Sequence, residues 1–158
     1  MNEHPVRQMI RTLLGGMFLL WLGGCVSEPT KPSPTATQVD QIRLALQGIT
    51  ESYEKKDEKA FFEKLDPAFK NAADLRNQTL QDFKAFSQME VQWTVDRVHI
   101  EEQGIWVAAH WGGVWKTTAE GPPLEKKGHV LFRWTSNDPP KLLEIRGDPP
   151  FGVFRSGT

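Results

Sequence analysis

Three histidines lie in the second half of the chain, and histidine is the side chain best suited to metal binding and to proton transfer near neutral pH. They are His99, His110 and His129. Metal sites usually show closely spaced ligands or added carboxylates in the sequence. Here each histidine stands alone on a different predicted strand. We therefore expect surface or interface histidines, with no metal site and no cofactor.

The single cysteine, Cys25, is the most specific chemical feature of the chain. It follows a basic segment that contains Arg7 and Arg11 and then the short apolar run of residues 13–22. This arrangement predicts a secretory signal peptide, because the apolar run is too short to span a bilayer as a helix. One cysteine alone also excludes a disulfide within the chain.

The residues that end this run, Leu22-Gly23-Gly24-Cys25, resemble the lipobox of bacterial lipoproteins. The resemblance implies cleavage before Cys25 and acylation of its sulfur and its new amino group, which together give stable membrane anchoring. The alternative is an ordinary cleaved signal with a chance cysteine. Val26 follows where an Asp retains lipoproteins of enteric-type bacteria at the inner membrane. The resemblance therefore favours the outer membrane, facing the periplasm.

Composition divides the rest of the chain. We expect a signal peptide over residues 1–24, a Pro/Ser/Thr-rich tether over 25–37, one folded domain over 38–147 and a loose tail over 148–158. With 19 basic and 20 acidic residues the formal net charge is −1. This balance lacks the basic stripe that binds phosphates, so we expect no nucleic-acid partner.

The first half of the domain reads as helical. Apolar residues at steps of three and four predict a helix over residues 38–55. Asp57 can cap a short second helix, which ends before Pro67. Residues 71–77 read as an irregular connector, and Thr79 with Asp82 as a weak capping box for a short third helix.

From Glu90 onward the apolar period changes to two, which is typical of strands. The apolar parity shifts after Val95, which predicts a β-bulge near Asp96 and Arg97. Further strands are expected over residues 104–118, 128–135 and 142–146. Helices followed by a meander predict an α+β fold, with N-terminal helices packed on a curved, mainly antiparallel four-stranded sheet.

This pattern resembles the nuclear transport factor 2-like, or cystatin-like cone, family. The resemblance rests on the break between Tyr53 and Asp57, the aromatic pair Phe61 and Phe62, and the closing strands over residues 128–134 and 141–145. It implies a sheet wrapped over the first helix, forming a cone that can hold an apolar pocket. The family includes ketosteroid isomerases, polyketide cyclases, dimeric binding modules and domains without chemistry.

Four residues are candidates for lining a pocket. Tyr53 lies near the end of the first predicted helix, and Trp93, Trp111 and Trp115 lie on the apolar side of the predicted strands. They either pack the core or line a ligand pocket. The isomerases of this fold need a carboxylate base and a tyrosine with an acid. Tyr53, Asp74 and Asp96 have suitable side chains but lie in no recognisable motif, so we assign no catalytic residue. We expect Tyr53 to be a core residue with its hydroxyl at the surface.

A candidate interface is formed by the strand residues that alternate with the inward apolar ones. These outward residues are Trp106, His110, Leu131 and Arg133. Large apolar and charged groups occur there together, and interfaces are enriched in Trp and Arg. Related domains often dimerise through the outer sheet face, so we expect a homodimer or a partner surface there.

Together these features predict a membrane-anchored envelope lipoprotein. Its domain is expected to bind a protein partner or a small apolar ligand without catalysis. Two alternatives stay open. One is an isomerase- or cyclase-type enzyme that acts on an apolar carbonyl compound, and the other is a structural accessory subunit of an envelope complex.

Overall fold

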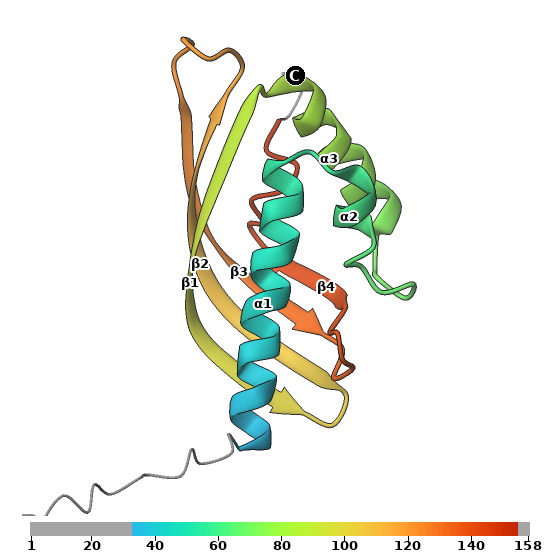
Figure 1. Cartoon of the computed structure of the whole chain (residues 1–158). Helices are drawn as coiled ribbons and strands as arrows, with labels where there is room; N and C mark the ends of the chain where they lie inside the picture. The colour runs from blue at the N-terminus through green and yellow to red at the C-terminus, as the bar shows by residue number, and fades with distance from the viewer. Residues whose placement is uncertain (1–32, 155–158) are drawn as a thin grey trace, which may run out of the picture. The chain divides into compact units, whose positions relative to one another are not determined.

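The computed structural model describes residues 33–154, so the predicted signal peptide and Cys25 lie outside the described residues. Helix α1 runs along one face of a sheet, with α2 and α3 beside it (Figure 1). In chain order the elements are α1 (Pro34–Glu54), α2 (Glu58–Phe62), α3 (Ala72–Ala85), β1 (Gln88–Glu101), β2 (Gly104–Lys116), β3 (Leu124–Trp134) and β4 (Leu142–Gly147).

Helix α1 begins four residues earlier than the sequence pattern predicted, because Pro34 rather than Gln38 is its first residue. Ser33 caps the helix, and its hydroxyl accepts a hydrogen bond from the Ala36 N–H at 3.2 Å. Serine at the N-cap followed by proline in the first turn is a strong helix start. The tether prediction was therefore wrong for residues 34–37, where overall composition hid a local capping signal.

Helix α2 begins after Asp57 as expected, and the Asp57 side chain accepts a hydrogen bond from the Ala60 N–H at 2.9 Å. Helix α3 differs from the prediction, because it starts at Ala72 and includes most of the expected connector. Thr79 is not a cap but a fully buried residue in mid-helix. Polar residues on the buried face of α3 concealed its helical period.

Within the described range the strands form one antiparallel sheet in the order β1-β2-β3-β4, which confirms the predicted α+β architecture. The pairing of β1 with β2 shifts register between Val95 and Arg97, at the predicted bulge. The two parities of β2 also separate as expected. Its inward residues Ile105, Val107, Ala109, Trp111 and Trp115 are at most 4% exposed.

The loose tail expected over residues 148–158 was wrong for its described part. Phe151 and Val153 belong to the core, with exposures of 1% and 7%. We refer to residues 148–154 as the C-terminal segment. It passes close to the end of α3, near the C label in Figure 1. No helix of the described residues is long and apolar enough to cross a membrane.

Candidate functional site

The most unusual group in the interior is the carboxylate of Asp82, on the buried face of α3. Asp82 is fully buried, and buried carboxylates are rare unless they are paired or hydrogen-bonded. The Tyr53 hydroxyl, at the end of α1, donates to Asp82 Oδ2 at 2.6 Å. The Trp115 indole N–H in turn donates to the Tyr53 oxygen at 3.0 Å. These three residues form a chain of hydrogen bonds from α3 through α1 to β2.

The C-terminal segment donates three further hydrogen bonds to this carboxylate. Consecutive backbone N–H groups of Gly152 and Val153 donate to Asp82 Oδ2 at 2.6 and 2.9 Å, and the N–H of Phe154 donates to Oδ1 at 2.6 Å. Gly152 has φ +77°, a conformation that favours glycine and that turns successive N–H groups toward one anion. Asp82 thus binds the segment as an anion binds a nest of amides.

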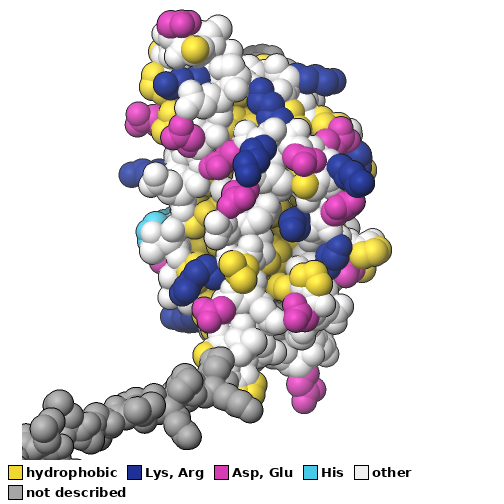
Figure 2. Space-filling model, in the orientation of Figure 1, with side chains coloured by type: hydrophobic (Ala, Val, Ile, Leu, Met, Phe, Trp, Pro, Cys, Tyr) yellow, Lys and Arg dark blue, Asp and Glu magenta, His cyan; other side chains and the backbone are white. Residues whose placement is uncertain are grey.

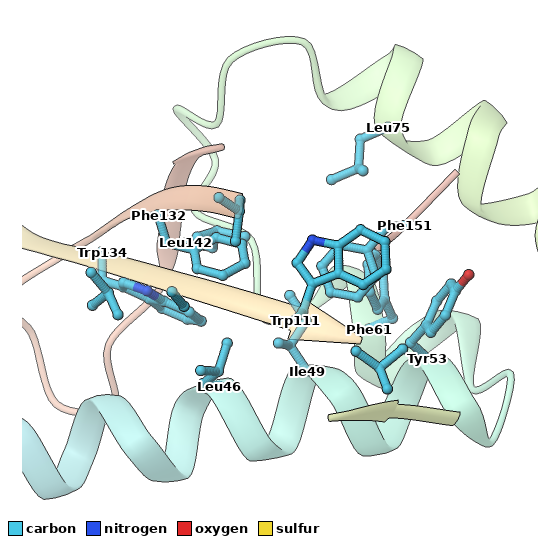
Figure 3. Packing of buried hydrophobic residues seen from close by; sticks show 14 of the residues in the cluster. Leu46, Ile49, Tyr53, Phe61, Leu75, Trp111, Phe132, Trp134, Leu142 and Phe151 are labelled. Carbon is cyan, nitrogen blue, oxygen red and sulfur yellow. The ribbon is translucent and has the colours of Figure 1, made fainter. Parts of the chain in front are cut away.

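Aromatic rings surround this polar cluster. Phe151 lies edge-on to Tyr53 and to Phe61, with ring centroids 5.0 and 5.1 Å apart (Figure 3). Edge-to-face packing at these separations is favourable beyond simple area burial. The ring of Phe151 therefore fills the interior space next to Tyr53.

Burial raises the pKa of the Tyr53 hydroxyl far above its ordinary value, and the negative charge of Asp82 adds to the shift. The hydroxyl is fully enclosed, so the expectation that it reaches the surface was wrong. Its oxygen accepts from Trp115 while its proton goes to Asp82. Tyr53 and Asp82 have the side chains of a catalytic tyrosine and acid. Each of their hydrogen bonds described above is made with another residue of this chain.

The four candidate pocket residues come together only in part. Trp111 and Trp115 pack edge-on with centroids 5.9 Å apart, and both are buried like Tyr53. The indole N–H of Trp111 donates to the Asp148 carbonyl at 2.6 Å, which ties β2 to the C-terminal segment. Trp93 is half-buried, and its indole donates to the Thr50 hydroxyl on α1 at 2.7 Å.

The outer sheet face carries the four candidate interface residues. Trp106 is half-buried, and the guanidinium groups of Arg133 and Arg146 lie over its ring, 5.4 and 4.8 Å from the centroid. Such contacts are attractive because the ring face is negative. A hydrogen bond from Arg146 holds the pKa of the Glu144 carboxyl below its ordinary value. Leu131, on the next strand, pairs with Ala108 and is half-buried.

The remaining candidates for chemistry are exposed. His110 Nδ1 lies 2.8 Å from Asp96 Oδ1, and the rings of His110 and His129 are 5.9 Å apart on paired strands. Asp74 lies exposed in the first turn of α3. Within residues 33–154 no group of three or more metal-ligating side chains converges.

A groove of about 700 Å³ crosses the outer face beside His110, above Gly112 and Val114. An added Cβ on Gly112 would meet nothing within 4 Å, so at that residue the floor of the groove is bare backbone. Its walls mix both charges, from Glu125 to Lys127. On the face of the molecule that is turned toward the viewer, Figure 2 shows acidic and basic side chains interspersed, with no patch of a single sign.

No protein-family model matches the sequence, and no curated protein matches it either. Solved structures do match the fold. A nuclear transport factor 2-like superfamily protein from Salmonella enterica serovar Typhimurium has a TM-score of 0.60 at 13% identity, covering 78% of this chain and 96% of its own. A candidate dehydratase of the same family from Streptomyces avermitilis has a TM-score of 0.58 at 16% identity, covering 72% and 97%.

A third similar structure, a conserved protein from Planctomyces limnophilus, has a TM-score of 0.61 at 12% identity and covers 71% of this chain and 98% of its own. The domain therefore has the α+β cone fold of nuclear transport factor 2-like proteins. At these identities the likeness concerns the fold alone, and it assigns no activity.

Sequence reasoning missed Asp82 as a site residue. A signal was available, since Leu75, Thr79 and Asp82 lie at helical spacing and share the buried face of α3. An acid on such a face requires a hydrogen-bond partner inside the fold.

Proposed function

We propose that this chain is a lipid-anchored protein of the bacterial cell envelope whose cone domain acts by binding and not by catalysis. The anchor part of the proposal is supported by the resemblance of Leu22-Gly23-Gly24-Cys25 to a lipobox. The absence of catalysis is supported by one observation, the saturated carboxylate of Asp82. It accepts hydrogen bonds from Tyr53 and from three amides of the C-terminal segment.

This observation bears directly on the enzyme alternative. An isomerase- or cyclase-type mechanism needs an acid and a tyrosine that face a substrate cavity. Here Phe151 packs against Tyr53, and the amides of residues 152–154 donate to the Asp82 carboxylate, so the chain itself contacts both groups. Activity on an apolar carbonyl compound would therefore require the C-terminal segment to leave the core.

The outer sheet face supports binding to a protein. Trp106, with Arg133 and Arg146 over its ring, gives that face an aromatic and cationic centre, the composition that interfaces favour. We propose that this face binds a second copy of the chain or an envelope protein. An accessory role in an envelope complex is the second form of the same proposal.

Two experiments test the two parts separately. Replacing Cys25 by Ser removes the acyl acceptor, so the protein should leave the membrane fraction and lose labelling by radioactive palmitate. Unchanged fractionation and labelling would refute the anchor.

The second experiment uses Trp106→Glu and sedimentation velocity, with Leu44→Glu as the control. Leu44 lies on α1 and is 67% exposed, so the control makes the same kind of change on a different face. We expect only Trp106→Glu to lower the sedimentation coefficient or to release a co-purified partner. Equal behaviour of both variants would contradict the proposed surface.

A further inference from the structure

The free edge of β1 is a second surface with the geometry of a binding site. Strand β1 pairs with β2 on one side only and is therefore an edge strand of the sheet. On its other side, the N–H of Val91 donates to Glu54 Oε1 of α1 at 2.7 Å. This contact fixes the direction in which the backbone groups of alternate residues point.

In an antiparallel pair, the N–H and C=O of one residue point to the same side, and residues two apart repeat that direction. Since the N–H of Val91 points away from β2, the backbone groups of Trp93 and Val95 do the same. Within residues 33–154, no hydrogen bond is made by the backbone of Trp93 or Val95 on this side. Two donors and two acceptors therefore stand in a row at the edge.

The row of unpaired backbone groups at Trp93 and Val95 is bounded at both ends. At one end, Glu54 occupies the N–H of Val91. At the other, the bulge at Asp96 interrupts the regular pairing. Bulges and blocked amides are two of the ways in which proteins protect edge strands. The stretch from Trp93 to Val95 remains unprotected, and Val95 is one of the exposed large apolar residues, at 40%.

A groove of about 570 Å³ lies between this edge and α1. Trp93 forms part of its wall, and the indole is held in place by its hydrogen bond to Thr50. Val95 adds exposed apolar surface, and Leu46, which is 4% exposed, lies at the base of the groove. A strand placed beside β1 would find unpaired backbone groups along one side and an apolar wall for alternate side chains on the other.

The flank of α1 gives this groove an electrical polarity. Glu54 contacts Val91, and Thr50 contacts Trp93, so α1 runs antiparallel to β1. The four-residue step along the helix and the two-residue step along the strand both cover about 6 Å, so the two elements stay side by side. Arg43 therefore lines the end near Val95, and Glu51 the end near Val91. Their ion pairs with Asp40 and Lys55, both at 3.5 Å, are exposed and hence weak.

We propose that the β1 edge from Trp93 to Val95 binds an extended peptide segment of a partner protein, which adds a strand to the sheet. The segment has an apolar side chain facing Leu46, an acidic residue toward Arg43 and a basic residue toward Glu51. Backbone hydrogen bonds supply the affinity, and the groove supplies the side-chain preference. This surface is distinct from the outer sheet face, so each proposal can fail without the other.

The test starts with selection of random heptapeptides displayed on phage against the immobilised full chain in detergent micelles. A selected peptide is then synthesised and its affinity measured by calorimetry. We expect N-methylation of one alternate set of amides to weaken binding about tenfold or more, and methylation of the other set to have little effect. Failure to enrich any peptide over the bare support would overturn the proposal.

The matched protein variants are Val95→Pro and Val95→Thr. Proline removes the edge N–H, which the fold itself does not use, and proline is tolerated on edge strands. We expect Val95→Pro to weaken binding about tenfold, while Val95→Thr, which keeps the amide, retains affinity within about threefold. Circular dichroism of each variant checks its fold. Equal affinities of the two folded variants would contradict strand addition.

Arg43→Glu provides a second test. Because Arg43 is exposed on α1, this substitution leaves the sequence of strand β1 unchanged. We expect this variant to prefer peptides in which the acidic residue is replaced by lysine. An unchanged preference would overturn the proposed orientation. Peptides whose binding is abolished by Trp106→Glu instead would show that the outer sheet face is the peptide site.

Discussion

The hydrogen bonds at Asp82 lead to the sharpest prediction, which concerns the change Asp82→Asn. The asparagine keeps the size of the side chain but can accept at only one of its two terminal atoms. Oδ2 receives Tyr53, Gly152 and Val153, so the amide nitrogen is best placed at Oδ1, facing the N–H of Phe154. The variant then loses one charge-assisted bond and weakens three others. The lost bond to a charged group alone corresponds to about 1.5–3 kcal/mol, and the three weakened bonds add to it, so we expect a loss of at least about 2 kcal/mol.

The assay is urea unfolding at neutral pH, followed by tryptophan fluorescence and circular dichroism. The control is Asp74→Asn on the same helix, which removes an exposed carboxylate from the first turn and should change the free energy of unfolding by less than about 1 kcal/mol. A value for Asp82→Asn as small as the control would refute the view that this carboxylate holds the C-terminal segment.

A double-mutant cycle locates the effect at that segment. Phe154→Pro removes the N–H that donates to Asp82 Oδ1, whereas Phe154→Ala retains it. We expect Phe154→Pro to be coupled to Asp82→Asn by about 1 kcal/mol, and Phe154→Ala to add to it within about 0.5 kcal/mol. Additivity in both cycles would show that the bond to Phe154 does not contribute to stability.

Two further predictions follow from the core. Because burial raises the folded-state pKa of Tyr53, the unfolded state loses its proton first, and stability should fall by up to about 1.4 kcal/mol per pH unit above pH 10. Tyr53→Phe should remove that part of the alkaline decline, and equal slopes for the two proteins would contradict it. The second prediction compares Gly113→Ala with Gly112→Ala in thermal unfolding. An added Cβ on Gly113 would lie 2.3 Å from the Trp115 ring, so we expect Gly113→Ala to lower the free energy of unfolding by about 1–3 kcal/mol. An added Cβ on Gly112 meets nothing within 4 Å, so we expect Gly112→Ala to be neutral or slightly stabilising. Equal melting temperatures would contradict this packing argument.

The sheet was predictable because each strand carries its own burial pattern. In β2, side chains such as Val107 and Trp111 alternate with outward ones, and local alternation is enough to assign the two faces. The bulge near Asp96 was predictable for the same reason, since one extra residue shifts the parity of everything after it. These features depend on neighbours in the sequence.

The carboxylate site could not be predicted in this way, because its partners are distant in the sequence. Asp82 binds residues 152–154, and no local period connects the end of α3 with that segment. Phe151 and Val153 stand between prolines and glycines, a composition that also describes unstructured tails. Their burial is decided by a long-range contact, and such contacts leave no periodic trace.

The early start of α1 limits how far the domain can lie from Cys25. Helix α1 begins at Pro34, so residues 26–33 are all that separates Cys25 from the first helix in the sequence. Fully extended chain covers at most about 3.6 Å per residue, which confines the first turn of α1 to within about 30 Å of the cysteine. An acylated Cys25 would therefore keep the domain in a thin layer next to the bilayer. Partners in that layer would meet it at a raised effective concentration, so that even a short, weak strand contact could be occupied.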